Sequence, residues 1–367
     1  MSKVRHVLGI SGGKDSAALA IYVKTKYPSI DLEFYTCDTG KELDETYQLI
    51  KNLEVYLGIK IELLQGAQNS SEDPFDHFLK MYGGFLPSSN ARWCTKKLKL
   101  DPFENYVGTD PVISYVGIRG DEEREGYIST KKNIQSIFPF RKNIWSKDVT
   151  DLILKNDNIP ILKEIYESQF RKEIKDKFLV TLPQKTTLSF TKEQKLDLLL
   201  NAGTKEFNKI VFEFLKSTDY PLSKIEDFPL IENDEILIRA DVFRILEESG
   251  VGVPAYYNKI DFEINGKKGQ YARSRSGCFF CFFQQKIEWV WLYEQHPVRF
   301  KKAMEYEKDG YTWMQNESLE ELIQPQRMEQ IKEDYIKRME RKSKAKSPYL
   351  MDILDDAEGE GCAACFI

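Results

Sequence analysis

The chain has 367 residues, of which 41% are apolar and 13% aromatic, so it can form one large or two modest domains with a buried core. This composition excludes a disordered chain, and no stretch approaches the roughly 20 apolar residues that a membrane helix needs. The net charge of −5 excludes a protein that is basic throughout, but not one with a local basic face. The N-terminus lacks a signal-peptide pattern, so we expect a cytoplasmic protein that binds no membrane.

The first part of the sequence alternates short apolar runs with segments of helical periodicity. This alternation predicts an α/β fold with a doubly wound, mostly parallel sheet, whose ligands bind at the carboxyl ends of the strands. The second helix should end at Gly58. The expected strands are Val4–Ile10, Leu32–Cys37, Ile59–Leu64 and Val112–Ile118, and the expected helices are Ser16–Tyr27 and Glu42–Leu57.

Composition divides the chain into four expected parts. Residues 1–150 form a nucleotide-binding domain, and residues 151–235, rich in Lys, Glu, Leu and Phe, form a helical insertion. Residues 236–310 carry a C-x-x-C pair and complete the catalytic domain. Residues 311–367 form a helical, charged tail that ends in a second C-x-x-C pair.

A glycine-rich loop, Ser11-Gly12-Gly13-Lys14-Asp15-Ser16, follows the first expected strand. Glycines permit positive φ angles and leave room for an anion, while the backbone N–H groups and the next helix present positive charge to it. Ser11 and Ser16 add hydroxyl donors, Lys14 adds a charge, and Asp15 could cap the helix or help to hold Mg²⁺. The spacing is not that of a Walker A loop, so we expect a different use of the nucleotide.

Four further motifs follow this loop in order, and together the five resemble the phosphoadenosine phosphosulfate reductase branch of the PP-loop ATP pyrophosphatase superfamily. The resemblance implies either reduction of an activated sulfate or ATP-driven adenylation with sulfur transfer. Enzymes of tRNA thiolation and the sulfurtransferase of DNA phosphorothioation belong to the second group. The four motifs are Cys37–Glu42, Arg92–Lys99, Gly117–Arg124 and Arg275–Cys281.

The resemblance implies roles for several residues near the nucleotide. Asp38 and Thr39 would read the nucleoside, and Gly117 with Arg119 would face the phosphates, where a guanidinium can stabilise developing charge. Lys14, Ser16 and Arg119 are the expected catalytic residues. Arg124 lies among acidic residues, and a surface ion pair explains it equally well.

The cysteines favour a metal or redox site, because thiols in the cytoplasm are kept reduced. Spacing alone leaves zinc, a thiol–disulfide pair and an iron–sulfur cluster open for Cys278 and Cys281. The resemblance favours a 4Fe–4S cluster with Cys94 as a third ligand, although reductases of this kind have two cysteines at that position. Cys362 or Cys365 could supply the fourth ligand, form a mobile persulfide arm, or hold zinc with the first pair. Cys37 is expected to be a buried core thiol.

Basic and aromatic residues surround the cysteine motifs. Lys96, Lys97 and Lys99, with Arg273 and Arg275, could form a basic rim for a nucleic acid or for nucleotide phosphates. The aromatic residues could stack on bases or form a core around the cysteines. These are Phe279, Phe280, Phe282, Phe283, Trp289, Trp291 and Tyr293. The three histidines, at positions 6, 77 and 296, receive no catalytic role.

These observations predict an ATP-dependent, AMP- and pyrophosphate-forming sulfurtransferase with an iron–sulfur cluster, acting on DNA or tRNA. Its expected cofactors are ATP, Mg²⁺ and the cluster, and its expected partners include a cysteine desulfurase or a thiol reductant. One alternative is a reductase of adenylylsulfate or phosphoadenylylsulfate. Another is a nucleotide-sensing subunit of a larger, defence-type complex.

Overall fold

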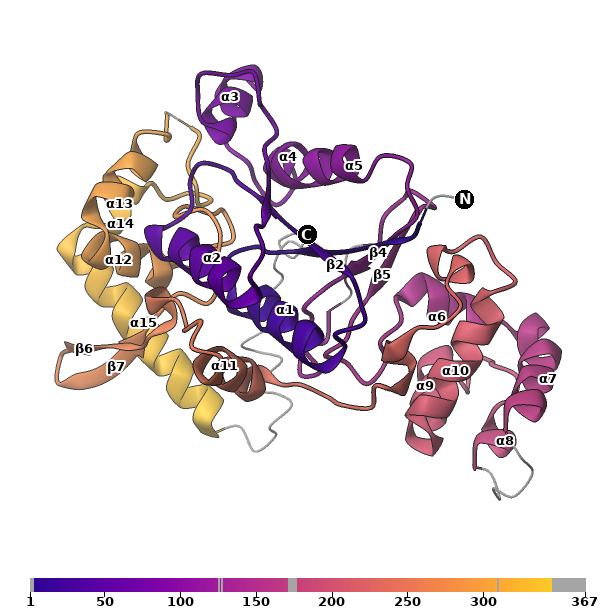
Figure 1. Cartoon of the computed structure of the whole chain (residues 1–367). Helices are drawn as coiled ribbons and strands as arrows, with labels where there is room; N and C mark the ends of the chain where they lie inside the picture. Colours follow the sequence, from indigo (N-terminus) through magenta and orange to yellow (C-terminus); the bar gives the residue numbers. More distant parts are fainter. Residues whose placement is uncertain (1–2, 125, 127, 171–176, 309, 345–367) are drawn as a thin grey trace. The chain divides into compact units, whose positions relative to one another are not determined.

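The computed structural model describes residues 3–124, 126, 128–170, 177–308 and 310–344 of the chain (Figure 1). A parallel sheet with the strand order β3-β2-β1-β4-β5 confirms the predicted α/β class. No helix among the described residues is long and apolar enough to cross a membrane. The strands are β1 (Arg5–Gly9), β2 (Leu32–Cys37), β3 (Glu62–Leu64), β4 (Val112–Tyr115) and β5 (Ile134–Ile137).

Most predicted elements appear with shifted ends. Strand β2 has the predicted bounds, and helix α2 ends at Leu57 because Gly58 adopts a left-handed conformation and its N–H bonds to Glu54 O. Strand β4 stops at Tyr115, three residues earlier than predicted, although the chain stays buried to Ile118. Strand β5 was not predicted, because its two central residues, Gln135 and Ser136, are polar although the structure buries them.

The chain divides into two compact units, each of which combines distant parts of the sequence. Unit 1 comprises Met1–Gly9, Ala18–Phe34 and Val107–Val242. Unit 2 comprises Ile10–Ala17, Tyr35–Tyr106 and Phe243–Ile367. Unit 2 therefore contains the glycine-rich loop Ser11–Ser16, which we call the phosphate loop. It also contains the Asp38-Thr39 motif and the cysteine motifs at 94 and 278–281.

In unit 1, the predicted insertion is helical in its described residues, and its helices pack around α10 (Figure 1). The buried Trp145 donates its indole N–H to Asn208 of α10 (2.9 Å), which links the insertion to the segment after β5. The helices are α6 (Lys147–Ile153), α7 (Ile159–Gln169), α8 (Lys177–Thr181), α9 (Lys192–Ala202) and α10 (Thr204–Leu215), with 3₁₀ turns η2 (Asn156–Asn158), η3 (Pro221–Lys224) and η4 (Pro229–Glu232).

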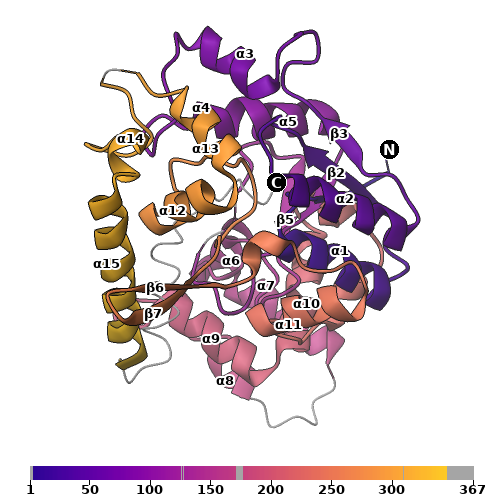
Figure 2. The ribbon, with the colours of Figure 1, turned by 90° about the vertical axis from the view of Figure 1, so that its left-hand side faces the viewer.

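In unit 2, helices α12 to α15 pack together and the hairpin β6–β7 lies beside α15 (Figures 1 and 2). The hairpin turns at Asn265-Gly266, both with positive φ, as a tight two-residue turn requires. The elements are α3 (Pro74–Met81), α4 (Trp93–Thr95), the π-helix η1 (Lys96–Leu100), α5 (Asp101–Val107), η5 (Ala255–Tyr257), β6 (Ile260–Ile264), β7 (Lys267–Tyr271), α12 (Lys286–Gln295), α13 (Pro297–Met304), α14 (Leu319–Leu322) and α15 (Pro325–Lys344). Helix α2 (Asp44–Leu57) lies in unit 2, whereas α1 (Lys14–Lys26) and α11 (Arg239–Glu248) each have residues in both units.

His6 on β1 makes the stability of the fold depend on pH. Its Nδ1 lies 2.7 Å from Tyr115 OH on the neighbouring strand, and burial lowers the pKa of the imidazole to about 4. Between pH 4 and pH 6.5 the unfolded chain therefore binds a proton that the folded chain does not, so stability is lost as the pH falls through this window.

Between pH 7 and pH 5, we expect the wild type to lose about 2 kcal/mol more unfolding free energy than His6→Gln. The imidazole is protonated only in the unfolded wild type over about 1.5 pH units, from pH 6.5 to pH 5, and each unit costs about 1.4 kcal/mol. Urea unfolding of both proteins at the two pH values measures this difference. Equal losses in the two proteins would show that His6 does not resist protonation.

Candidate nucleotide and sulfur site

The phosphate loop lies between β1 and α1 and is closed by its own hydroxyl groups. The N–H of Ser11 donates to Ser16 Oγ (3.2 Å), the two serine hydroxyl oxygens lie 3.1 Å apart, and Ser16 Oγ donates to Gly13 O (3.1 Å). Helix α1 begins at Lys14, so the last three residues of the loop form the positive N-terminal end of this helix. This arrangement favours an anion at the loop.

Lys14 is held at the start of α1 by a carboxylate and an aromatic ring. Its Nζ lies 3.0 Å from Asp15 Oδ2 and 4.8 Å from the centre of the Tyr257 ring, and all three residues are buried. Next to Tyr257, the hydroxyl of Tyr256 donates to Gly12 O (3.0 Å). The loop is therefore supported from η5, whose two tyrosines carry no motif that identifies them in the sequence.

Both glycines of the loop are required by close neighbours. Gly12 has φ 70°, and a Cβ there would overlap the Thr46 methyl group. A Cβ on Gly13 would lie 2.5 Å from the hydroxyl oxygen of Ser276. Ser276 belongs to the motif Arg275–Cys281, which we call the cysteine loop. The cysteine loop therefore packs directly on the phosphate loop.

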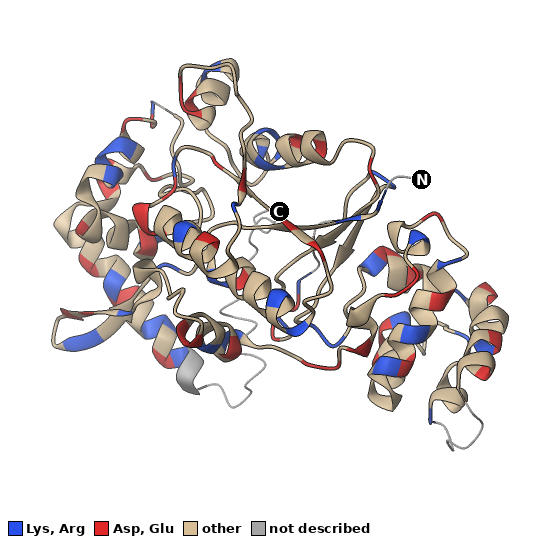
Figure 3. Ribbon diagram, viewed as in Figure 1, with Lys and Arg blue, Asp and Glu red and all other residues tan. Residues whose placement is uncertain are grey.

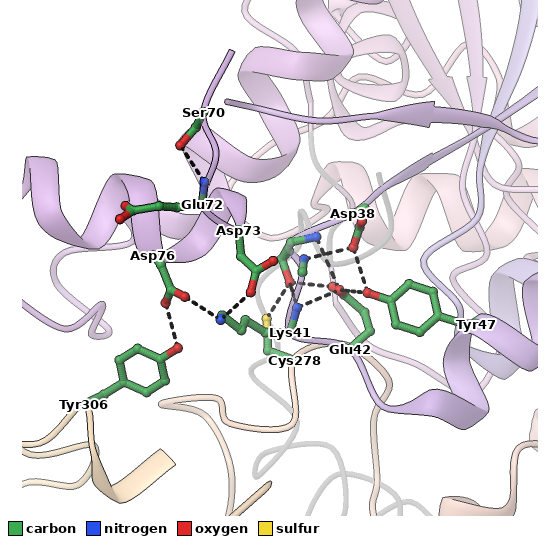
Figure 4. Close-up of polar contacts among 12 residues, drawn as sticks. Asp38, Lys41, Glu42, Tyr47, Ser70, Glu72, Asp73, Asp76, Cys278 and Tyr306 are labelled. Carbon is green, nitrogen blue, oxygen red and sulfur yellow. Dashed lines mark hydrogen bonds and ion pairs between the residues drawn. The ribbon is translucent and has the colours of Figure 1, made fainter. Parts of the chain in front are cut away.

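The segment after β2 is a dense network of polar side chains (Figure 4). Thr39 Oγ1 donates to Glu42 Oε1 (2.6 Å), and the hydroxyl of Tyr47 donates to Asp38 Oδ1 (2.9 Å) and Glu42 Oε2 (3.2 Å). Burial raises the pKa of Glu42 to about 7. Burial alone would also raise the pKa of Asp38, but hydrogen bonds from its neighbours, Gly40 N–H first, lower it below its ordinary value.

The cysteine loop is fixed to this network by backbone and side chain (Figure 4). Cys278 and Glu42 form a β-bridge, and the N–H of Phe279 donates to Lys41 O (2.7 Å). Cys278 Sγ lies 3.2 Å from Thr39 Oγ1, and burial raises the pKa of its thiol well above the ordinary value. A neutral sulfur thus lies within hydrogen-bond distance of a residue that the sequence assigns to the nucleoside.

The segment that carries Cys94 reaches the same region. The Arg92 guanidinium carbon lies 4.8 Å from the centre of the Phe283 ring, two residues beyond Cys281. Cys94 and Cys278 pack against one hydrophobic core, in which Phe75 contacts both Trp93 and Phe280. Cys94 and Cys278 therefore border the same hydrophobic core of unit 2, and a shared cluster of Cys94, Cys278 and Cys281 stays a prediction.

Lys41 ties this network to α3 (Figure 4). Its Nζ lies 2.9 Å from Asp73 Oδ2 and 2.7 Å from Asp76 Oδ2, and the hydroxyl of Tyr306 donates to Asp76 Oδ1 (2.6 Å). Burial alone would lower the pKa of Lys41, but the hydrogen bonds to both carboxylates raise it above the ordinary value. The motif residue next to Glu42 thus serves as an anchor, a role that its sequence position does not reveal.

The donor atoms of the described residues decide whether a metal or cluster fits this site. The described residues contain no group of three or more His, Cys, Asp or Glu side chains arranged to hold a metal ion. Cys362 and Cys365 lie outside the described residues, so the 4Fe–4S cluster, the zinc alternative and Mg²⁺ remain predictions. Two residues hydrogen-bonded to the cysteine carbonyls, Arg273 to Cys278 O and Gln284 to Cys281 O, carry buried side-chain atoms that lack a described partner.

The predicted arginine motif, Gly117–Arg124, lies in unit 1, whereas the phosphate loop lies in unit 2. The Arg119 guanidinium is buried and pairs with Asp121 (2.8 Å) and Glu122 (2.7 Å). Arg124 pairs with the same Glu122 (2.6 Å), as the ion-pair alternative anticipated. Gly117 precedes this cluster, and its role and that of Arg119 at the phosphates remain predictions.

The predicted basic rim is only partly present on the surface. Arg273 is buried, and Lys97 pairs with Asp101 (2.7 Å), whereas Lys96 is exposed. Base stacking is contradicted for the four residues that the structure buries in the core, because no base could reach them. These four are Phe279, Phe280, Trp289 and Trp291. Cys37 is half-buried, and burial raises the pKa of its thiol to about 12.

The fold and this site define a nucleotide-binding α/β protein of the PP-loop kind. Residues 5–172 match the model of the phosphoadenosine phosphosulfate reductase domain. This part of the chain is similar to that domain, and the match covers less than half of the chain. An uncharacterized protein of Methanocaldococcus jannaschii is 33% identical over 175 residues, which cover 45% of this chain and 34% of that protein. The match thus spans about a third of that relative's length.

Gly12→Ala should weaken ATP binding by about 10-fold or more, because the new methyl group strains a left-handed residue and displaces Thr46 from the loop. Gly58→Ala is the matched control, since Gly58 has φ 66° but open space around its α-carbon. The control should lose about 1 kcal/mol of stability and keep its ATP affinity. Equal ATP affinities in the two variants, measured by equilibrium dialysis, would contradict the close packing at Gly12.

The double variant Asp73→Asn/Asp76→Asn should be destabilised by about 1–3 kcal/mol, because it leaves the buried Lys41 ammonium without a carboxylate. Adding Lys41→Met removes that charge and should restore most of the loss. Guanidinium unfolding of the three proteins measures the effect. A triple variant no more stable than the double would mean that Lys41 is not an anchor.

Proposed function

We propose that this protein uses ATP to activate an oxygen of a nucleic acid as an adenylate, and that a cysteine-bound sulfur then displaces AMP. Pyrophosphate leaves in the first step and would be held by the loop Ser11–Ser16. The thiolated nucleic acid is the product of the second step.

The observation that supports this proposal most strongly is that the cysteine loop packs against the phosphate loop. Ser276 packs over Gly13, and Cys278 Sγ lies 3.2 Å from Thr39 Oγ1. A sulfur nucleophile must approach the adenylate closely to displace AMP, since reacting atoms need near-contact distances. Thiols beside a nucleotide loop meet that requirement without a large movement of the chain.

Two cysteines at C-x-x-C spacing suit a balanced transfer. A donor such as a cysteine desulfurase loads one thiol as a persulfide. Its terminal sulfur attacks the carbon or phosphorus that bears the adenylated oxygen, and this oxygen leaves as part of AMP. The second thiol then attacks the resulting mixed disulfide, which releases the thiolated acceptor and leaves a Cys278–Cys281 disulfide. A thiol reductant returns the pair to two thiols.

A second function is favoured by the description of the matching family. A thiol beside the phosphate loop could instead attack the sulfur of adenylylsulfate or phosphoadenylylsulfate and expel the nucleotide, after which a reductant releases sulfite. A third, the nucleotide-sensing subunit, needs binding without turnover. All three use the same loop, so the products must separate them.

The deciding experiment follows labelled ATP with anaerobically purified full-length protein, alone and with single-stranded DNA, duplex DNA or tRNA. We expect AMP and pyrophosphate release that one nucleic acid stimulates. Lys14→Ala should lower this release by about 100-fold or more, because it removes charge from the phosphate site. Cys278→Ser should abolish sulfur incorporation from a persulfide donor, whereas Cys37→Ser, which alters a half-buried thiol outside the C-x-x-C pair, should not.

Each alternative has its own outcome in the same assay. Sulfite release from a sulfonucleotide with thioredoxin, without AMP release from ATP, would replace the sulfurtransferase by a reductase. Tight ATP binding without any turnover would favour the nucleotide-sensing subunit.

A further inference from the structure

An exposed group of aromatic and basic side chains adjoins the cysteine site in unit 2. Phe85 is 53% exposed and Tyr311 47% exposed, and their rings meet edge to face with centres 4.9 Å apart. Large aromatic side chains are seldom left this exposed in pairs, so such a pair indicates a binding surface. A base could stack on either ring.

Three exposed cations lie along the same segments. Arg92, Lys96 and Lys308 are exposed, and none of them forms an ion pair with another described residue. Other cations nearby are neutralised: Lys97 pairs with Asp101, and Lys80 pairs with Glu72. The acidic chain therefore leaves a local group of unpaired positive charges beside the aromatic pair.

Contacts show that these side chains form one continuous surface. The Trp93 indole donates to Phe85 O (3.0 Å), which places Arg92 next to the aromatic pair. Lys308 lies against Gly84, the residue before Phe85, and Lys96 follows Arg92 by one helical turn, since its N–H bonds to Arg92 O (3.4 Å). The π-helix η1, which continues from α4, carries Lys96, Lys97 and Lys99, and Figure 3 shows blue ribbon in this helical stretch.

The surface reaches the cysteine motifs through Arg92 and Phe283. Arg92 is two residues before Cys94, and its guanidinium is held over Phe283, two residues after Cys281. The cation–π contact fixes the Arg92 guanidinium at the edge of the sulfur site. A chain bound along the surface would therefore run past the cysteines.

We infer that Phe85, Tyr311, Arg92, Lys96, Lys308 and Phe283 form a stacking platform that binds a single-stranded segment of nucleic acid. Phosphates pair with the three cations and unpaired bases stack on Phe85 and Tyr311, whereas Phe283 orients Arg92. A duplex would hide its base faces from these rings, so the platform selects single strands. This inference deepens the proposed function and rests on it only in taking a nucleic acid as the acceptor.

The test is the binding of a fluorescein-labelled, mixed-sequence 20-nucleotide DNA to the full chain without ATP, followed by fluorescence anisotropy. The same strand annealed to its complement is the competing ligand. We expect the single strand to bind more tightly. Phe85→Ala/Tyr311→Ala should weaken its binding by about 10-fold or more, because each lost ring removes a stacking partner of a base.

A second variant tests the charges. Arg92→Ala/Lys96→Ala/Lys308→Ala should weaken binding and reduce the slope of log affinity against log salt by about 2, since each phosphate contact on a single strand contributes about 0.7. The matched control is Tyr56→Ala/Lys51→Ala on α2, which removes an exposed aromatic ring and an exposed lysine elsewhere. It should bind like the wild type.

Tighter binding of the duplex, no binding of either DNA, or equal losses in the platform and control variants would overturn the inference. If the platform variants bind weakly but ATP never yields AMP, the platform stands and the proposed function fails. If AMP is released with a nucleic acid but the platform variants bind normally, the function stands and the platform is wrong.

Discussion

The short segment from Asp38 to Glu42 is the constraint on which unit 2 depends. Its polar backbone and side chains bond to two parts of the chain that are far apart in sequence, the cysteine loop and the start of α3. The Lys41 carbonyl accepts from Phe279, the Lys41 ammonium is paired with Asp73 and Asp76, and the Thr39 hydroxyl meets the Cys278 sulfur. Because each bond uses a different group of the same five residues, a shift of this segment would move the cysteine loop and α3 together.

The polar residues of this segment also satisfy one another, and Glu42 is the clearest case. Glu42 is buried, and it accepts hydrogen bonds from the Thr39 hydroxyl, the Tyr47 hydroxyl and the N–H of Lys41. Burial of such a carboxyl is costly unless hydrogen bonds compensate it. The protein accepts this cost at the point where a nucleotide and a thiol would meet, and strained or desolvated polar groups commonly collect at functional sites.

The sequence predicted the class of fold and the phosphate loop because both depend on local patterns. The helix end at Gly58 and strand β2 follow from periodicity and from the left-handed conformation of one residue. Strand β5 escaped prediction because Gln135 and Ser136 are buried, which only the surrounding unit decides. The hairpin β6–β7 could have been predicted, since Asn265-Gly266 is a strong turn signal between alternating strands.

The supporting residues of the site could not be found in the sequence, since they come from distant segments. Tyr256, Tyr257 and Ser276 reach the phosphate loop only after the chain has folded. Cys94 and Cys278 were linked by resemblance, and the rings of Phe75, Trp93 and Phe280 supply a physical reason for their common location. The aromatic residues next to the cysteine motif suggested a surface for base stacking, but Trp289 and Trp291 are buried in the core. The exposed rings, Phe85 and Tyr311, come from loops that carry no motif.

An acidic chain that handles polyanions must concentrate its positive charge where it is needed. Lys14 and Lys41 are both paired with carboxylates and buried, so their charges act locally and contribute little to a long-range field. Arg92, Lys96 and Lys308 are exposed, and Arg92 lies over the Phe283 ring, so that charge and stacking can act on the same ligand. Selectivity would then come from shape and stacking, because net repulsion by the rest of the surface disfavours any polyanion that cannot use the rings.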